Sequence, residues 1–308
     1  MSQGQIISLG SVNVDFQVRA ERWPEPGETL LGGEFLMIGG GKAANVAYLA
    51  RRLGVAARLV ARVGDDPLHE HALQALRTAG VDLSQTLTVG GCATGVALIV
   101  VRPDGEKAIV LAANANDGWT PADADAVAAA VAEAGPGSVL VADLEVPGFV
   151  VRRAVESARG TGYGVVLDPS PADRMPPDLY PFVDCITPNR TEAERLTGIA
   201  VRRTKDAYRA GEVLRDRGVR AACMKIGAEG CVVVSPDTQV HLPAFPVRTV
   251  DATGAGDAFA GALGVALLEG QPVREAARFA VAAAAAAVTR YGSQPSYPTR
   301  AEIQRLLR

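Results

Sequence analysis

Short apolar runs alternate with amphipathic stretches along most of the chain. The apolar runs predict buried strands over residues 6–10, 59–63, 138–142, 164–168, 184–187, 221–226, 231–235 and 239–242. Apolar residues at helical spacing predict helices over residues 43–53, 66–78, 121–133, 148–159, 191–197, 206–217, 255–269 and 273–289. Strands separated by helices form mostly parallel sheets that are covered on both faces. We therefore expect a three-layer α/β/α fold with a binding site beyond the carboxyl ends of the strands.

Four extended segments interrupt this alternation. They span residues 12–19, 30–38, 94–101 and 107–113, and Pro103-Asp104-Gly105-Glu106 between the last two has the composition of a hairpin turn. Alternating polar and apolar residues are typical of strands with one exposed face. The four segments therefore predict a small second sheet beside the large one.

The composition limits the classes to which the protein can belong. A length of 308 residues with 48% hydrophobic residues suits one large domain, or one domain with a small appendage. A formal net charge of −3, without blocks of Lys and Arg, argues against a nucleic-acid partner. The longest apolar run, residues 279–288, has about half the length that spans a bilayer. The N-terminus lacks the pattern of a signal peptide, so we expect a cytoplasmic protein without a membrane partner.

The cysteines also favour a reducing compartment. They lack C-x-x-C spacing, which is typical of buried free thiols rather than of a disulfide framework or a zinc site. The four residues are Cys92, Cys185, Cys223 and Cys231.

The stretch Asp251-Ala252-Thr253-Gly254-Ala255-Gly256-Asp257 precedes an apolar helical segment and carries the strongest chemical signal. Small residues before a helix leave backbone N–H groups uncovered, and with the positive end of the helix dipole these groups bind phosphate oxygens. Asp257 places a carboxylate beside the expected anion. Two interpretations stay open: a Gly-rich turn whose Asp stabilises the helix start, or an anion-binding loop with a general base.

A second Gly-rich stretch, Gly39-Gly40-Gly41-Lys42-Ala43-Ala44, begins another predicted helix. With Asp65 about twenty residues further on, it fits a loose form of the dinucleotide-binding fingerprint, so a Rossmann-type NAD enzyme is one alternative. Such a fingerprint normally opens the first βαβ unit, whereas here two predicted strands precede it. A phosphate-binding P-loop is excluded because alanine follows the lysine, where Ser or Thr would hold magnesium.

Five motifs in order give the chain a likeness to a known family. They are Gly10-Ser11-Val12-Asn13-Val14-Asp15, Gly40-Gly41-Lys42-Ala43-Ala44-Asn45, Thr187-Pro188-Asn189-Arg190-Thr191-Glu192, Lys225-Ile226-Gly227-Ala228-Glu229-Gly230 and the stretch 251–257. Together with the predicted fold, they resemble the ribokinase-type (PfkB) carbohydrate kinases over essentially the whole length. The resemblance implies a single kinase domain over residues 1–308, with a ribokinase-like α/β/α core and the small sheet as a lid.

The resemblance assigns the reaction to the stretch 251–257. It implies that Asp257 is the general base for a sugar hydroxymethyl group that attacks the γ-phosphate of ATP. It also implies that the backbone of Gly254, Ala255 and Gly256 binds the transferring phosphoryl group. This agrees with the residues alone, because phosphoryl transfer depends on in-line positioning and charge neutralisation.

The sugar-binding residues that the resemblance implies come from the first two motifs and from one strand end. Asn13 and Asp15 lie two apart on a predicted strand and therefore point the same way, which suits a polyol but also an Asx turn. Glu145 follows the strand over residues 138–142, where a ligand is expected. The full set is Asn13, Asp15, Gly41, Lys42, Asn45, Glu145 and Asp257.

The resemblance also implies residues for the nucleotide and for cations. Asn189 and Glu192 match an element that helps to place Mg²⁺ and phosphates, although they also suit an ordinary helix start. The implied ATP-binding set is Asn189, Glu192, Lys225, Gly227, Ala228, Gly230 and Gly256. An activating K⁺, held largely by carbonyl oxygens, is implied at Asp251, Thr253, Ala287, Arg290, Gly292 and Ser296. It would stiffen the anion-binding loop; a helix end capped by Gly292 is the other interpretation of that segment.

One motif position departs from the ribokinase pattern. Ala43 stands where ribokinases commonly have Gly, and an added methyl group changes the discrimination between substrates by about 1–3 kcal/mol. Lid residues are expected to select the sugar, but their sizes name no substrate. These positions are Ala97, Ile99, Leu111 and Ala113.

The predicted function is that of an ATP-dependent sugar kinase, with the 5-hydroxyl of D-ribose as the expected acceptor. Fructose, 2-keto-3-deoxygluconate and nucleosides are alternative acceptors within the class. A Rossmann-type NAD enzyme and a catalytically silent sugar-binding module are alternatives from other classes. Binding of NAD without ATP would support the first, and the complete anion-binding loop argues against the second. The open edge of the predicted lid would be covered by a second copy, so we expect a homodimer.

Overall fold

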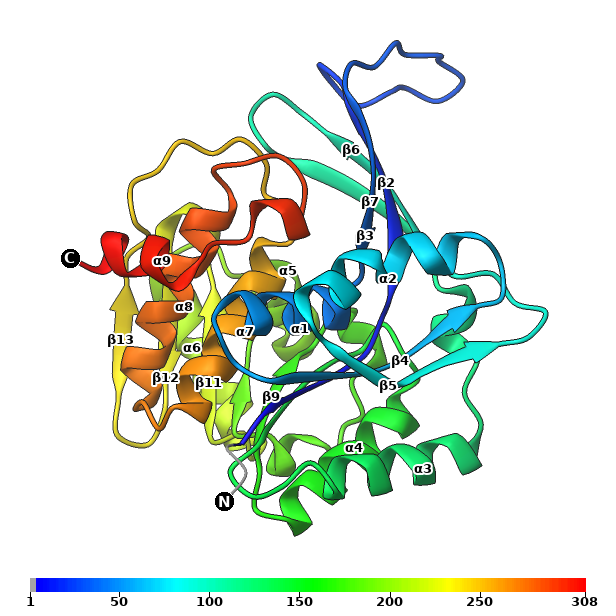
Figure 1. The fold of residues 1–308 in the computed structure, drawn as a ribbon. Helices are drawn as coiled ribbons and strands as arrows, with labels where there is room; N and C mark the ends of the chain where they lie inside the picture. Colours follow the sequence, from blue (N-terminus) through cyan, green and yellow to red (C-terminus); the bar gives the residue numbers. More distant parts are fainter. Residues whose placement is uncertain (1–3) are drawn as a thin grey trace.

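The computed structural model describes residues 4–308, which form two sheets, with helices on both faces of the larger one (Figure 1). The larger sheet has nine strands in the order β13-β12-β11-β10-β9-β8-β1-β4-β5. Neighbouring strands from β11 to β5 are parallel, whereas β12 and β13 are antiparallel at one edge. The strands are β1 (Ile6–Leu9), β4 (Ala57–Gly64), β5 (Asp82–Val89), β8 (Val139–Asp143), β9 (Gly164–Asp168), β10 (Cys185–Ile186), β11 (Ala221–Lys225), β12 (Cys231–Val234) and β13 (Gln239–Leu242).

Two helical layers cover the faces of this sheet. One layer comprises α1 (Lys42–Arg52), α2 (Leu68–Ala79), α7 (Ala255–Leu268), α8 (Val273–Ala287) and α9 (Arg300–Leu307). The other comprises α3 (Pro121–Ala132), α4 (Gly148–Gly160), α5 (Arg190–Thr197) and α6 (Thr204–Asp216). Val139 and Val141 pack in the core of the first layer, and Leu140 and Ala142 in that of the second, because successive strand residues point to opposite faces. The predicted three-layer α/β/α fold is confirmed.

Helix α7, which begins at the predicted anion-binding loop, is positioned by small residues. A Cβ atom at Gly264 would lie 2.6 Å from Val141 Cγ2 on β8, and one at Gly261 would lie 3.3 Å from Leu49 Cδ2 on α1. Glycine at both places lets α7 approach the sheet and α1 closely. Close packing of this kind fixes the position of the helix start.

The second sheet has four strands in the order β3-β2-β6-β7 (Figure 1). They are β2 (Asn13–Arg19), β3 (Phe35–Gly40), β6 (Gly95–Val101) and β7 (Lys107–Ala112). Strand β2 pairs antiparallel with β3 and parallel with β6, and β6 pairs antiparallel with β7. Since β2 follows β1 after three residues, the small sheet extends from the carboxyl end of a central strand of the large one.

The register of the small sheet gives its two faces different characters. One row across the four strands is apolar and at least partly exposed: Met37, Phe16, Leu98 and Val110. The next row points to the opposite face: Ile38, Asp15, Ala97 and Leu111. In that row Asp15 and Ala97 are buried. The face with Asp15 is therefore covered by the rest of the protein, and the other face carries exposed apolar side chains.

The structure differs from the sequence prediction at three elements. The strand predicted over residues 30–38 is shorter at its start, because β3 begins at Phe35, after the glycines at 32 and 33 that weaken strand pairing. Strand β5 was not predicted, because it is a polar edge strand without a buried apolar run. Helix α9 was not predicted either, although Thr299 and Glu302 form a capping box at its start.

All four cysteines are free thiols. Cys185, Cys223 and Cys231 are buried on β10, β11 and β12, as expected, whereas Cys92 is only half-buried. Within residues 4–308, none of the helices combines the length and the apolar character needed to cross a membrane.

Candidate active site

The predicted anion-binding loop leads directly into α7. Gly254 precedes the helix with a φ of 73°, a left-handed conformation that favours glycine. Its carbonyl oxygen accepts a hydrogen bond from Tyr297 Oη at 3.0 Å. A Cβ atom on Gly254 would lie 2.6 Å from the same Tyr297 Oη. Ala255 and Gly256 form the first turn, where backbone N–H groups lack partners within a helix. This geometry suits an anion at the positive end of a buried helix.

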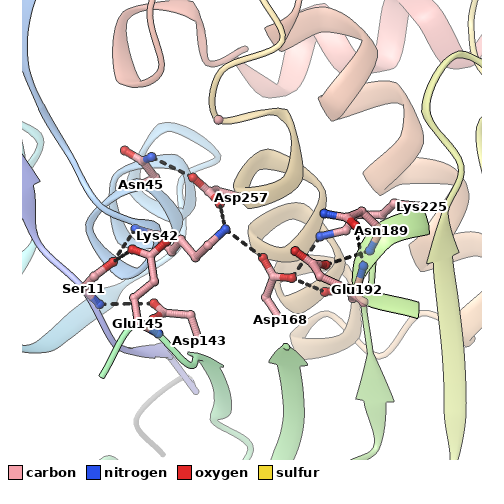
Figure 2. A network of polar contacts seen from close by, with 12 residues as sticks. Ser11, Lys42, Asn45, Asp143, Glu145, Asp168, Asn189, Glu192, Lys225 and Asp257 are labelled. Carbon is pink, nitrogen blue, oxygen red and sulfur yellow. Dashed lines mark hydrogen bonds and ion pairs between the residues drawn. The ribbon is translucent and has the colours of Figure 1, made fainter. Parts of the chain in front are cut away.

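Asp257, in the same turn, is bonded to another helix rather than to its own. Its Oδ2 accepts a hydrogen bond from Asn45 Nδ2 at 2.8 Å, and Lys42 Nζ lies 3.4 Å from its Oδ1 (Figure 2). Both partners lie at the start of α1. The side chain is nearly buried, with 7% of the residue exposed. A carboxylate held in this way is oriented by α1, which favours a functional role over helix capping.

A row of alternating charges leads away from Asp257. Lys42 Nζ lies 3.5 Å from Asp168 Oδ2, and Lys225 Nζ donates to Asp168 Oδ1 at 3.0 Å (Figure 2). Although burial raises the pKa of Asp168, the ammonium groups of Lys225 and Lys42 hold it below its usual value. Burial lowers the pKa of Lys42, but Asp257 and Asp168 raise it well above its usual value. Both shifts favour the charged forms of Asp168 and Lys42.

Lys225 connects this row to the anion-binding loop. A Cβ atom at Gly256 would lie 3.3 Å from Lys225 Nζ, so glycine leaves the ammonium group close to the backbone of the loop. After Lys225 the chain forms the turn that holds the other residues predicted to lie along the nucleotide. These are Gly227, Ala228 and Gly230.

Asn189 and Glu192 form the capping box of α5. Asn189 Oδ1 accepts from Glu192 N at 2.9 Å, and Glu192 Oε2 accepts from Asn189 N at 2.7 Å. The hydrogen bonds of these two residues are thus those of an ordinary helix start, which the sequence analysis gave as the alternative. Glu192 is also buried near Asp168, and burial followed by the charge of Asp168 raises the pKa of its carboxyl group. A cation or a phosphate-bound metal ion beside Glu192 and Asp168 would reduce the repulsion between their two carboxylates.

Glu145 joins a second network at the carboxyl end of β8. Ser11 Oγ donates to Glu145 Oε2 at 2.6 Å and accepts from Lys42 N at 2.9 Å. Asp143 accepts from the backbone N–H groups of Ser11, at 3.2 Å, and of Glu145, at 2.8 Å. Burial raises the pKa of Glu145, opposed by the charge of Lys42. Ser11 therefore ties Glu145 to the start of α1.

The sequence analysis missed Asp143 and Asp168 as site residues. Both are the last residue of a buried parallel strand, β8 and β9. The resemblance selected Glu145, and its place after a buried strand agreed with that choice; the same rule, a carboxylate at the carboxyl end of a strand, would have selected Asp143 and Asp168.

Asn13 and Asp15 lie on β2 and point to the covered face of the small sheet. Asn13 Oδ1 accepts from Asn116 Nδ2 at 2.8 Å, and Ser293 Oγ lies 3.5 Å from Asp15 Oδ2. Burial, followed by the charges of Asp257 and Glu145, raises the pKa of Asp15 to about 7. A buried carboxylate with so few partners is suited to accept hydrogen bonds from a polyol.

Glycines keep the backbone around Asp15 and Ser11 close. A Cβ atom at Gly40 would lie 2.2 Å from Asp15 Oδ2. Gly41 has a φ of 91°, and a Cβ atom there would lie 2.6 Å from the carbonyl oxygen of Ser11. The Gly-rich stretch before α1 thus allows β3 and α1 to approach the first motif.

The residues predicted to hold a potassium ion form two adjoining loops. The carboxylate of Asp251 accepts from the backbone N–H groups of Thr253, at 2.8 Å, and Gly292, at 2.9 Å, and from Gln17 Nε2 at 2.6 Å. Ala287 ends α8 close by, because Val288 O accepts from Asp251 N at 3.3 Å.

Arg290 and Ser296 complete this segment. The guanidinium of Arg290 bonds to Glu302 and to the carbonyl oxygen of Ser296, so only its backbone is free to contact a cation. Ser296 Oγ donates to Ser293 O at 2.7 Å. Among residues 4–308, no three His, Cys, Asp or Glu side chains are grouped as ligands for a metal ion. Any cation here would therefore depend mainly on carbonyl oxygens.

Two buried polar atoms at the site have no hydrogen-bond partner within residues 4–308. They are Asn45 Oδ1 and Thr253 Oγ1, one beside Asp257 and one in the anion-binding loop. A buried polar group without a partner costs about 1–3 kcal/mol. A small cavity in the site is lined in part by Lys42, Asp168 and Asp257. A ligand with hydroxyl and phosphate groups would supply the missing partners.

An anion-binding loop, a buried carboxylate and several ammonium groups at the carboxyl edge of a parallel sheet define a phosphotransferase site. The family of pfkB carbohydrate kinases matches residues 3–300. A ribokinase of Haemophilus influenzae is 37% identical over 299 residues, which are 97% of each chain. A deoxyribokinase of Salmonella typhi is 33% identical over 295 residues, which are 96% of this chain and 95% of that protein.

Solved structures agree with these relatives. A structure of Arabidopsis thaliana ribokinase complexed with ribose and ATP has a TM-score of 0.84 and 29% identity, and covers 100% of this chain and 99% of that one. The chain therefore belongs to the pfkB family of carbohydrate kinases, and it is a phosphotransferase that acts on a sugar hydroxyl group. The alternative of a Rossmann-type NAD enzyme is wrong.

Proposed function

We propose that this protein transfers the γ-phosphate of ATP to the 5-hydroxyl of D-ribose and yields D-ribose 5-phosphate. The observation that carries the proposal is Asp257, held by Lys42 and Asn45 at the start of α7 beside the anion-binding loop. The ribokinase of Haemophilus influenzae and the Arabidopsis structure with ribose and ATP support ribose as the acceptor.

Different residues of the chain bind the substrates, activate the attacking hydroxyl and stabilise the transferring phosphoryl group. Asp257 takes the proton of the attacking hydroxyl, a role that typically contributes about 10²- to 10⁴-fold to the rate. The backbone of Gly254, Ala255 and Gly256, with Lys225 beside it, compensates the charge of the transferring phosphoryl group. The remaining sugar hydroxyls bind to Asn13, Asp15, Gly41, Lys42, Asn45 and Glu145. The ATP phosphates and the adenosine extend along Asn189, Glu192, Gly227, Ala228 and Gly230.

Cations fit this site. Asn189 and Glu192 would help to place Mg²⁺, and the carbonyl oxygens of Asp251, Thr253, Ala287, Arg290, Gly292 and Ser296 would hold K⁺. When bound, the two ions add positive charge near the phosphates. The buried hydroxyl of Thr253, which has no partner within residues 4–308, supports an oxygen-seeking ion here.

We further propose that residues 1–308 form one kinase domain whose small sheet acts as a lid. Its segments are those predicted at 12–19, 30–38, 94–101 and 107–113. The exposed apolar row of Met37, Phe16, Leu98 and Val110 supports a homodimer through this sheet, because contiguous apolar patches mark interfaces. The three buried free thiols support a reducing compartment, the cytoplasm.

The proposed reaction is tested by ADP release from ATP and Mg²⁺ with ribose, deoxyribose, fructose, 2-keto-3-deoxygluconate and nucleosides. Each acceptor is measured in potassium buffer and in a buffer with only organic cations. We expect the highest kcat/KM for ribose, raised by potassium. A higher kcat/KM with another acceptor would refute ribose as the substrate, and turnover with none would refute the kinase activity.

A further inference from the structure

The chain has only four lysines, and three of them lie at the site. Lys42, Lys107 and Lys225 contact groups of the site, whereas Lys205 is exposed on α6. The reaction described above uses Lys42 and Lys225. Lys107 is the first residue of β7 and comes from the small sheet instead of the body of the protein.

Lys107 contacts the segment that leads into the anion-binding loop. Its Nζ donates to the carbonyl oxygen of Ala252 at 3.0 Å. The hairpin before β7 contacts the same residue, because Ala252 N donates to Gly105 O at 3.3 Å. The small sheet thus holds Ala252 by both its N–H and its carbonyl group.

The bond from Lys107 completes the fixing of one peptide unit. The carbonyl oxygen of Ala252 and the N–H group of Thr253 belong to the same planar peptide. Lys107 Nζ binds the oxygen, and Asp251 Oδ1 accepts from Thr253 N at 2.8 Å. Ala255 N also donates to the carbonyl oxygen of Ala252, at 3.3 Å. The orientation of the peptide between Ala252 and Thr253, one residue before Gly254, is therefore determined from both sides.

The ammonium group also brings positive charge near the reaction centre. It lies in the field of the carboxylates of Asp257, Asp251 and Asp15 and of the ammonium group of Lys42. Burial lowers the pKa of Lys107, and the charge of Asp257 opposes this effect. Holding a lysine side chain in one conformation costs side-chain entropy. The bond from Lys107 to a single carbonyl group therefore indicates a specific role rather than that of a solvated surface charge.

We propose that Lys107 is a positioning residue for phosphoryl transfer, which orients the anion-binding loop through Ala252 only when the small sheet lies against it. The inference rests on the proposed kinase function. Docking of the sheet would in this way complete the loop that binds the transferring phosphoryl group. Gln17, which donates to Asp251 Oδ2 from β2, contributes a third contact between the same sheet and the same segment.

The test compares Lys107→Met, which keeps the length of the side chain without its charge, with Lys107→Arg, which keeps the charge. Lys205→Met is the matched control on the exposed face of α6. We measure kcat, KM for ribose, KM for ATP and the melting temperature of each variant. We expect kcat of Lys107→Met to fall about 10- to 100-fold, less than or equal to the loss for a direct oxyanion donor. Both KM values should change less than about threefold, and Lys107→Arg should recover most of kcat.

The outcomes separate the inference from the proposed function. A wild-type protein without turnover would refute the kinase activity itself. An active wild type with an unchanged kcat in Lys107→Met would overturn the role of Lys107. A raised KM for ribose and a lowered melting temperature, without a specific loss of kcat, would also overturn it, because Lys107 would then only hold the sheet in place.

Discussion

Two carboxylates from different regions of the site are equally buried but carry opposite pKa shifts. Asp168, at the end of β9 in the large sheet, is 3% exposed, and Asp15, on β2 in the small sheet, is 4% exposed. Lys225 and Lys42 hold the pKa of Asp168 below its usual value, whereas burial raises the pKa of Asp15 to about 7. Burial alone therefore does not decide the charge of a group here; the partners do.

The difference shows how the two sheets divide the site. The large sheet and its helices supply charged groups that already neutralise one another, from Asp257 through Lys42 and Asp168 to Lys225. The small sheet supplies Asp15, whose carboxylate has no ammonium group within ion-pair distance among residues 4–308. We infer that the large sheet holds the reacting groups in place, while Asp15 on the small sheet acquires its hydrogen-bond partners when the sugar binds.

The largest effect is expected at the start of α7, in the prearranged part of the site. Asp257→Asn keeps the shape and the bond to Asn45 but removes the base, so kcat should fall by about 10²- to 10⁴-fold. ATP binding, measured by calorimetry, should stay nearly unchanged. Asp237→Asn, at an exposed turn after β12, is the control and should leave kcat intact. A near-normal kcat in Asp257→Asn would remove this residue from the mechanism. It would also contradict the inference that the large sheet and its helices hold the reacting groups in place.

The sequence alone predicted those parts of the site that are contiguous in the chain. The stretch 251–257 combines a loop and a helix start, so neighbouring residues specify its geometry. The three-layer fold was predictable because parallel strands buried on both faces form continuous apolar runs. Contacts between distant residues could not be derived in this way: Lys42 and Asp168 are 126 residues apart, and Lys107 and Ala252 are 145 apart. Only the strand order brings them together.

A smaller effect, with a distinctive pH dependence, is expected for Asp15→Asn. If Asp15 accepts hydrogen bonds from the sugar, the loss of its charge should raise KM for ribose by about 10- to 100-fold, since a bond to a charged group contributes about 1.5–3 kcal/mol. Wild-type KM for ribose should fall as the pH rises from 6 to 8, because Asp15 ionises near pH 7. The variant should lose this dependence.

Although Asp15→Asn should weaken ribose binding, it should raise the free energy of unfolding of the protein without ligand. The pKa of Asp15 is raised in the folded state from 3.8 to about 7. The folded chain then binds more protons than the unfolded chain between these values, so the free energy of unfolding falls as the pH rises toward 7. Asp15→Asn removes this loss. Compared with the wild type it should gain stability, on the order of a few kcal/mol, between pH 4 and pH 8.

Chemical unfolding of the wild type and of Asp15→Asn at pH 4, 6 and 8 measures this gain. Glu34→Gln, which also neutralises a carboxylate but on the exposed segment before β3, is the control and should show no such trend. A constant difference across this pH range would mean that Asp15 titrates normally. The contrast with Asp168 would then be lost.

The smallest effect on activity is expected on the outer face of the small sheet. Leu98, 55% exposed, lies in the apolar row with Phe16 and Val110, on the face opposite to Asp15. Leu98→Glu places a charge in the proposed dimer interface, and its cost there should convert the dimer to a monomer at micromolar concentration. Because the substitution points away from the site, kcat should change less than about twofold. Sedimentation velocity and steady-state kinetics measure the two quantities.

The control for Leu98→Glu comes from the large sheet. Leu87 on β5 is 45% exposed, and Leu87→Glu should leave the sedimentation coefficient unchanged, because no dimer contact is proposed there. A wild-type monomer at micromolar concentration would contradict the dimer. If Leu98→Glu dissociates the dimer and also lowers kcat strongly, contact with the second copy holds the small sheet in the position that the active site needs. In that case the small sheet would depend on its partner for the position of Asp15 and Lys107, and the division between the two sheets would extend to the oligomer.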